Sequence, residues 1–65
     1  MLEINGEMRR FDTPHTICTL LIELALDPER VVIEHNGTIP ERTAWQDICL
    51  KPGDRLEIVR FMGGG

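Results

Sequence analysis

The most distinctive chemistry in this sequence belongs to three consecutive glycines, Gly63 to Gly65, at its end. They directly follow Arg55 to Phe61, a run that is typical of a buried strand. Glycine has no Cβ and loses much backbone entropy on ordering, so we expect residues 62–65 to form a flexible tail. Such a thread, carrying an α-carboxylate, can enter a channel that is too narrow for side chains. We therefore predict that Gly65 is the reacting residue, with Gly63 and Gly64 entering the active site of a partner.

The other reactive side chains do not form a catalytic or metal-binding set. His15 and His35 lack the serine, cysteine or carboxylate arrangement that specifies a triad, and the carboxylates are scattered. Cys18 and Cys49 lie among apolar residues without C-x-x-C spacing, so we expect both to pack in the core as small hydrophobes. The sequence therefore predicts a protein that is not an enzyme, with no catalytic residues, no metal site and no bound cofactor.

Length and charge restrict the classes of partner. A chain of 65 residues makes one small domain, and a domain of this size buries only about 60% of its unfolded surface. Seven Lys and Arg against eleven Asp and Glu give a net charge of -4, which disfavours nucleic-acid binding and suits a partner with a positive surface. Neither a membrane-spanning apolar run nor a signal peptide is evident, so we expect a cytoplasmic protein without membrane contact.

The first half of the chain predicts a hairpin and then a helix. Leu2 and Ile4 alternate with polar residues, and Asn5-Gly6 is a strong hairpin signal, so the return strand should run from Glu7 to about Asp12. Apolar residues fall on opposite faces of that return strand, which predicts a bulge or an early end. The helix should begin at Ile17, with Thr16 as its N-cap or with a competing start at Thr13, and end at Asp27-Pro28.

The second half predicts short strands joined by tight turns. The β-branched run Val31–His35 reads as a strand and precedes an Asn-Gly turn. A helical turn over residues 41–45 should tuck Trp45 against the sheet. A short strand is expected at Ile48–Leu50, followed by a turn at Lys51–Asp54.

The final strand, Arg55 to Phe61, is apolar on both faces, which predicts an interior strand with a second contact surface. We expect it to lie beside the first strand, with the helix covering the side that carries Leu56 and Ile58. Three apolar residues would then remain as a partner-docking patch leading to the tail: Val59, Phe61 and Met62. Burial of Phe61 in the core is the alternative, because Phe is often buried.

These elements predict an α+β domain over residues 1–61, with a mixed sheet packed on one main helix. That order of elements is the pattern of the ubiquitin-like β-grasp fold. Residues 62–65 would form a separate glycine tail.

Six stretches of the sequence form a more specific set: Leu2–Gly6, Thr16–Leu24, Val32–Gly37, Ile39–Arg42, Trp45 and Lys51–Gly65. In these stretches the chain resembles the ThiS family of bacterial sulfur carriers over nearly its whole length. The resemblance implies a β-grasp fold and a role in forming the thiazole of thiamine. It departs from the family in minor ways, at Met62 and in the irregular second strand.

The resemblance also implies a reaction and its partners. A ThiF-type adenylyltransferase, which uses ATP and Mg²⁺, would convert Gly65 to an acyl-adenylate. Sulfur derived from a donor such as a cysteine desulfurase would displace AMP and leave a thiocarboxylate. A ThiG-type thiazole synthase would then take the sulfur.

Two alternatives remain open at the level of sequence. The chain could carry sulfur for molybdopterin, like the MoaD-type subunit of molybdopterin synthase, or act as a Urm-type ubiquitin-like modifier. It could instead be a binding module whose glycine end is a frayed terminus without a function. The free glycine terminus separates the last alternative from the others.

Overall fold

The structure, a computed structural model of the chain, describes residues 1–61. The predictions for Met62 and for Gly63 to Gly65 therefore lie outside the described residues. The described part contains β1 (Leu2–Ile4), β2 (Glu7–Arg9), α1 (Ile17–Glu23), the 3₁₀ turns η1 (Pro28–Arg30) and η2 (Arg42–Asp47), β3 (Val31–His35) and β4 (Arg55–Arg60).

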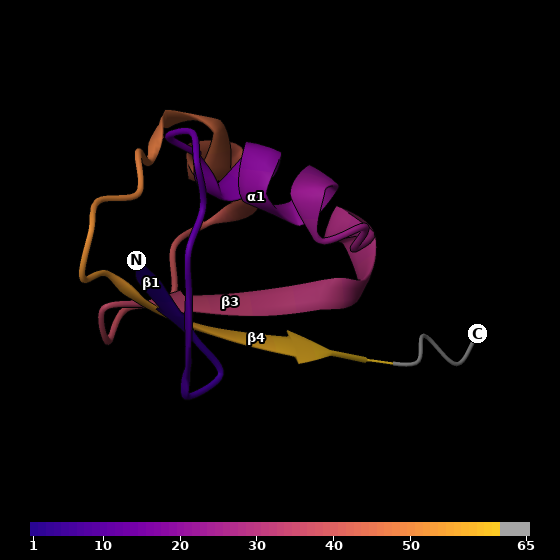
Figure 1. Cartoon of the computed structure of the whole chain (residues 1–65). Helices are drawn as coiled ribbons and strands as arrows, with labels where there is room; N and C mark the ends of the chain where they lie inside the picture. Colours follow the sequence, from indigo (N-terminus) through magenta and orange to yellow (C-terminus); the bar gives the residue numbers. More distant parts are fainter. Residues whose placement is uncertain (62–65) are drawn as a thin grey trace.

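One four-stranded sheet, in the order β2-β1-β4-β3, forms the base of the molecule. β4 lies in the interior, parallel to β1 and antiparallel to β3. The helix α1 crosses over one face of this sheet (Figure 1). The predicted pairing of the last strand with the first is therefore confirmed, as is the predicted mixed sheet on one helix.

Two Asn-Gly turns join neighbouring segments as predicted. At Asn5-Gly6 and at Asn36-Gly37 both residues have positive φ, 51° and 84° in the first turn and 50° and 90° in the second. Positive φ at both central positions is the requirement of a type I′ turn, which asparagine and glycine tolerate best. The return strand β2 ends at Arg9, so the expected early end is confirmed and the bulge is absent from the described ladder.

The helix begins where a reciprocal cap satisfies its first backbone donors. Thr16 is the N-cap, and its Oγ1 accepts from the Thr19 N–H at 3.2 Å. The Thr19 hydroxyl in turn accepts from the Thr16 N–H at 2.8 Å. This is a capping box with threonine in place of the usual Glu or Gln. The alternative start at Thr13 is wrong.

The helix ends four residues before the predicted Asp27. The Leu26 N–H donates to the Leu21 carbonyl at 2.9 Å, and the Ala25 N–H donates to the Ile22 carbonyl at 3.0 Å. This pair of bonds is a Schellman motif, and it places Ala25 in the left-handed region at φ 57°. The turn brings Leu26 back against the core, where it is partly buried. Asp27 instead caps η1, because its Oδ1 accepts from the Glu29 N–H at 2.9 Å.

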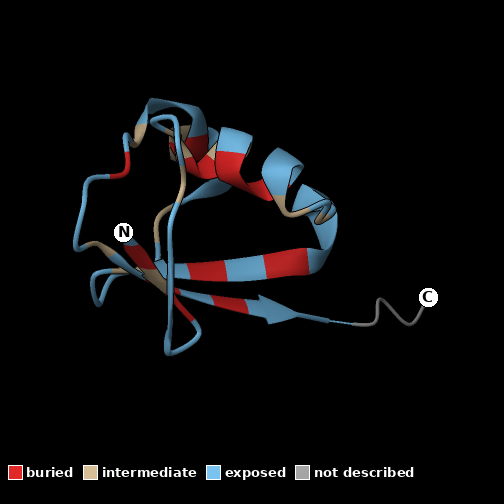
Figure 2. Cartoon of the chain, in the orientation of Figure 1, coloured by how far each residue is buried: buried red, intermediate tan, exposed pale blue. Residues whose placement is uncertain are grey.

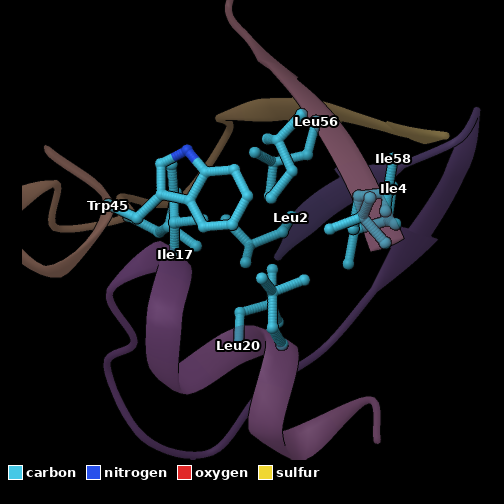
Figure 3. Close-up of a cluster of buried hydrophobic side chains, with 11 residues drawn as sticks. Leu2, Ile4, Ile17, Leu20, Trp45, Leu56 and Ile58 are labelled. Atoms are coloured by element: carbon cyan, nitrogen blue, oxygen red, sulfur yellow. The ribbon is translucent and has the colours of Figure 1, made fainter. Parts of the chain in front are cut away.

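The core lies between α1 and the sheet. Buried positions alternate along the strands and recur along the inner side of the helix (Figure 2). The close-up in Figure 3 shows side chains from the sheet, from α1 and from η2 meeting in this layer. The buried cluster consists of Leu2, Ile4, Ile17, Leu20, Leu21, Val31, Ile33, Trp45, Leu50, Leu56 and Ile58. Each large side chain in it contributes about 1.5–3 kcal/mol of transfer free energy before the entropy cost of ordering.

Trp45 is buried from η2, so the predicted helical turn is confirmed. The Arg42 guanidinium lies 5.3 Å from the centre of the Trp45 ring and donates to the carbonyls of Pro28 and Val31. These contacts connect η2 to η1 and to the start of β3. They also occupy a carbonyl of β3 on the side away from β4, which helps to protect that edge of the sheet.

Two predictions for the second half were wrong. Ile48–Leu50 is not a strand: Cys49 forms only an isolated bridge with Thr16. The partner segment enters α1 immediately after Thr16, so no longer ladder can form. Cys49 is also exposed rather than packed in the core, whereas Cys18 is partly buried against it.

Candidate functional site

The last strand separates two groups of side chains, as expected. Leu56 and Ile58 face α1 and are buried, with exposed fractions of 0% and 7%. Val59 points to the opposite face, which no helix covers, and is 60% exposed. Its cross-strand neighbour Val32 is 43% exposed. The open face of the sheet therefore presents an apolar cross-strand pair, one member of which the sequence analysis overlooked.

Phe61 lies just beyond the end of β4, not within it as the sequence predicted. Its backbone N–H donates to the Arg30 carbonyl at 3.0 Å, which fixes this position against the start of β3. Its side chain is 42% exposed and lines a hollow of about 260 Å³ together with Leu26 and Val31. Burial of Phe61 in the core is therefore wrong, and Phe61 lies at the end of the sheet rather than in the middle of its open face.

Charged side chains surround the apolar pair on the open face. The strand register sets Glu34 of β3 directly opposite Glu57 of β4, and both are exposed. These two carboxylates make the face locally acidic, and their mutual repulsion is destabilising. Glu3 and Arg55, paired between β1 and β4, approach to 3.5 Å. These charges could have been assigned to one face from alternation alone, once the register of the strands was known.

A polar cluster connects two turns at the opposite end of β4. Asp54 accepts from the backbone N–H of Lys51 at 3.0 Å and from the side chain of Asn36 at 3.2 Å, and its Oδ2 lies 3.0 Å from His35 Nε2. Burial alone would raise the pKa of Asp54, but the hydrogen bonds from His35, Lys51 and Asn36 outweigh it and lower that pKa below 3.8. The cluster thus holds a carboxylate in its charged form, in a structural role.

The remaining candidates do not come together in the described residues. His15 Nδ1 lies 3.0 Å from Thr19 Oγ1 beside the helix cap. Cys49 takes part in an isolated β-bridge with Thr16, which involves only its backbone. Within residues 1–61, no three side chains of His, Cys, Asp or Glu gather closely enough to hold a metal ion. No helix in that part of the chain has the length and apolar character needed to cross a membrane.

Comparison with known proteins decides the family. Residues 2–65 match the model of the ThiS family. The chain belongs to the ThiS family. The match includes the glycine end as well as the sheet and the helix, so the resemblance inferred from the six sequence stretches is confirmed.

Relatives of this ThiS family member include proteins of similar and of much greater length. It is 36% identical to the sulfur carrier protein ThiS of Bacillus subtilis over 67 aligned positions, which cover all of both chains. It is also 42% identical over 64 residues to a thiazole synthase of Paramagnetospirillum magneticum, covering 98% of this chain and 20% of that protein. The chain thus spans about a fifth of the length of the thiazole synthases it matches.

A solved structure confirms the fold. The crystal structure of the thiamine biosynthesis protein ThiS from Geobacter metallireducens superimposes with a TM-score of 0.84 at 36% identity, covering 98% of this chain and 97% of that one. The predicted ubiquitin-like β-grasp fold is therefore correct for this ThiS family member.

Proposed function

We propose that this protein is a sulfur carrier that supplies sulfur for the thiazole of thiamine. The observation that carries the proposal is the family match over residues 2–65, which extends from the β-grasp body into the three glycines. A relative named as a sulfur carrier aligns over its whole length, and a structural neighbour is named as a thiamine biosynthesis protein. In this role the chain is a co-substrate acted on by enzymes rather than an enzyme itself.

The chemistry would take place at the carboxylate of Gly65. Attack of this carboxylate on the α-phosphorus of ATP would form an acyl-adenylate and release pyrophosphate. A sulfur nucleophile would then bond to the acyl carbon, the carbon–oxygen bond to the phosphate would break, and AMP would leave with its electron pair. ATP and Mg²⁺ belong to the activating enzyme, where the metal neutralises phosphate charge. This chain supplies the acyl group and a docking surface.

Three partners follow from that sequence of steps: a ThiF-type adenylyltransferase, a sulfur donor such as a cysteine desulfurase, and a ThiG-type thiazole synthase. The third has additional support, because two relatives named thiazole synthase contain a region similar to this whole chain. We place the exchange in the cytoplasm, where the ATP for activation is available.

The docking surface we propose consists of Val32, Val59, Phe61 and Met62. The first three are exposed in the structure, and Met62 follows them in sequence outside the described residues. Contiguous exposed apolar patches often mark partner sites, and an aromatic residue is a favoured anchor. In sequence the patch ends at Met62, directly before the glycines that would enter the partner.

The test is intact-mass analysis of the chain after incubation with the adenylyltransferase, ATP and sulfide. We expect a mass increase equal to the difference between sulfur and oxygen, and tandem fragmentation should assign it to Gly65. A Gly64→Val variant should fold normally but resist conversion, because a β-branched side chain would not fit a channel shaped for glycine. Full conversion of a variant that lacks Gly64 and Gly65 would overturn the proposal.

A further inference from the structure

Two arginines, Arg30 and Arg60, lie at the end of the sheet from which the chain continues into residues 62–65. Arg60 is the last residue of β4 and is exposed. It lines the hollow beside Phe61 together with Arg30, and it lines an adjoining hollow of about 230 Å³ together with Arg9. Arg9 reaches that second hollow from β2, which is joined through β1 to the start of β4 and not to its end. We call Arg30 and Arg60 the basic rim. The end of β4, the start of β3 and the loop after α1 all meet at this end of the molecule (Figure 1).

Both hollows combine apolar walls with charged edges, and Asp27 lines the first of them beside Arg30 and Arg60. Their apolar side chains come from the loop after α1 and from the strands: Ile4, Leu24, Leu26, Val31, Ile58 and Phe61. Arg60 makes no ion pair or side-chain hydrogen bond with any other residue in positions 1–61. Arg30 has only an exposed contact of 3.6 Å with Asp27, an arrangement that contributes little to stability. The guanidinium groups of Arg30 and Arg60 therefore remain accessible to a partner.

This basic end differs in charge from the rest of the molecule. The chain carries a net charge of -4, and the open face of the sheet has Glu34 and Glu57 directly opposite each other. Asp27 lies 3.6 Å from Arg30, whereas Arg60 is paired with no carboxylate within residues 1–61 and offers a partner a local positive charge on an otherwise acidic chain. Complementary fields of this kind orient proteins during encounter and raise their association rate.

The length of chain beyond Phe61 requires the rim to lie close to the partner. The Phe61 N–H is fixed to the Arg30 carbonyl, and the residue that reacts under the proposed function, Gly65, comes four residues later. Four residues reach at most about 14 Å when fully extended. If Gly65 is to reach a nucleotide inside an enzyme, the residues around Phe61 must lie against the entrance to that site. This step rests on the proposed function.

We propose that the basic rim docks on an acidic, partly apolar surface around the active-site entrance of the adenylyltransferase. Carboxylates of the enzyme pair with Arg60 and Arg30, and an apolar side chain of the enzyme occupies the hollow beside Phe61. Guanidinium groups suit this role because they bind carboxylates through two parallel hydrogen bonds. The rim thereby orients the protein so that the end of the chain faces the active-site entrance of the adenylyltransferase.

The test is the affinity of charge-reversed chains for the adenylyltransferase, measured by isothermal titration calorimetry. Arg60→Glu should weaken binding on the order of tenfold at about 50 mM salt, and the difference from the native chain should shrink at about 500 mM salt. Lys51→Glu is the matched control, since it makes the same change of charge at the opposite end of β4 and should alter affinity by less than about twofold. Arg60→Gln should fall between Arg60→Glu and the native chain.

Three outcomes would overturn the inference. One is equal weakening by Arg60→Glu and Lys51→Glu, which would mean that only net charge matters. The second is no salt-dependent loss in Arg60→Glu or Arg60→Gln, with circular dichroism showing that at least one of them is folded. The third is a loss confined to binding of thiazole synthase. Mass analysis of the native chain distinguishes these three outcomes from failure of the proposed function. If the native chain forms no thiocarboxylate, the proposed function is wrong, and the inference, which rests on it, is wrong as well.

Discussion

At the scale of single residues, Ala25 shows the conflict between local preference and the needs of the fold. The Schellman motif that ends α1 requires a left-handed residue at this position, and Ala25 has φ 57°. Glycine adopts this conformation without the Cβ penalty, and for that reason it is the usual residue there. The sequence contains no glycine between Gly6 and Gly37. The signal that marks most helix ends is therefore missing, and the pattern predicted an end four residues too late.

We predict that Ala25→Gly stabilises the protein by about 0.5–1 kcal/mol, because relief of the left-handed strain exceeds the extra entropy of glycine in the unfolded chain. Ala25 is exposed, so the lost methyl group costs little packing. Urea denaturation monitored by circular dichroism measures the change. Ala44→Gly in η2, where φ is not positive, is the control and should destabilise the protein. A loss of stability in both variants would contradict the strain at Ala25.

Asp54 is a second residue whose role depends on the fold. Its carboxylate joins the turn after β3 to the turn before β4. The hydrogen bonds from His35, Lys51 and Asn36 outweigh burial, so its pKa is lower in the folded chain than its ordinary value of 3.8. A lowered pKa means that the charged form stabilises the native state. This contribution is complete above the unfolded pKa and is lost as the pH falls through the folded pKa.

We predict that Asp54→Asn lowers the free energy of unfolding by about 1 kcal/mol at neutral pH, since it removes charge-assisted hydrogen bonds. The gap between the native chain and Asp54→Asn should narrow as the pH falls below 3.8. Denaturation curves collected across this pH range would show it. The control is Asp47→Asn, which neutralises an exposed carboxylate in η2 and should leave stability nearly unchanged at both ends of the range. A difference in stability that stays constant with pH would contradict the lowered pKa of Asp54.

At the scale of elements, the sequence predicted what local patterns determine. The Asn-Gly turns, the N-cap at Thr16 and the central position of the last strand each follow from residues that are neighbours in the chain. Residues 48–50 looked like a strand because they are short and apolar, but a strand also needs a partner of sufficient length. That partner ends where α1 begins, so only the bridge at Cys49 remains.

Long-range features of the site could not be predicted from the sequence, because they too depend on which distant segments pair. The pairing of Val32 with Val59 and of Glu34 with Glu57 depends on the register between β3 and β4. Arg30 and Arg60 come from two separate segments, and only the folded chain brings them to one end. Arg42 formed part of the family resemblance, but its contacts with the carbonyls of Pro28 and Val31 leave no local pattern.

At the scale of the whole molecule, the two faces of the sheet have different tasks. One face is filled by α1 and holds the core, whereas the other keeps its apolar pair exposed beside carboxylates (Figure 2). Phe61 lies at the end of the sheet, beside the basic rim. Docking through the face and orientation through the rim would together present the chain end to the enzyme. Their contributions can be separated because apolar contacts depend far less on salt than ion pairs do.

We therefore predict that Phe61→Ala weakens binding to the adenylyltransferase by more than about 1 kcal/mol, as removal of an aromatic anchor does. Since Phe61 is 42% exposed, its loss should cost well under the roughly 3–5 kcal/mol of a fully buried Phe→Ala change. The defect should persist at high salt, unlike that of Arg60→Glu. Ile22→Ala is the matched control, because Ile22 is 77% exposed on α1, away from the open face, and should not affect binding. Calorimetry for binding and urea denaturation for stability distinguish the two effects, and a large stability loss with unchanged affinity of the folded fraction would assign Phe61 to the core instead.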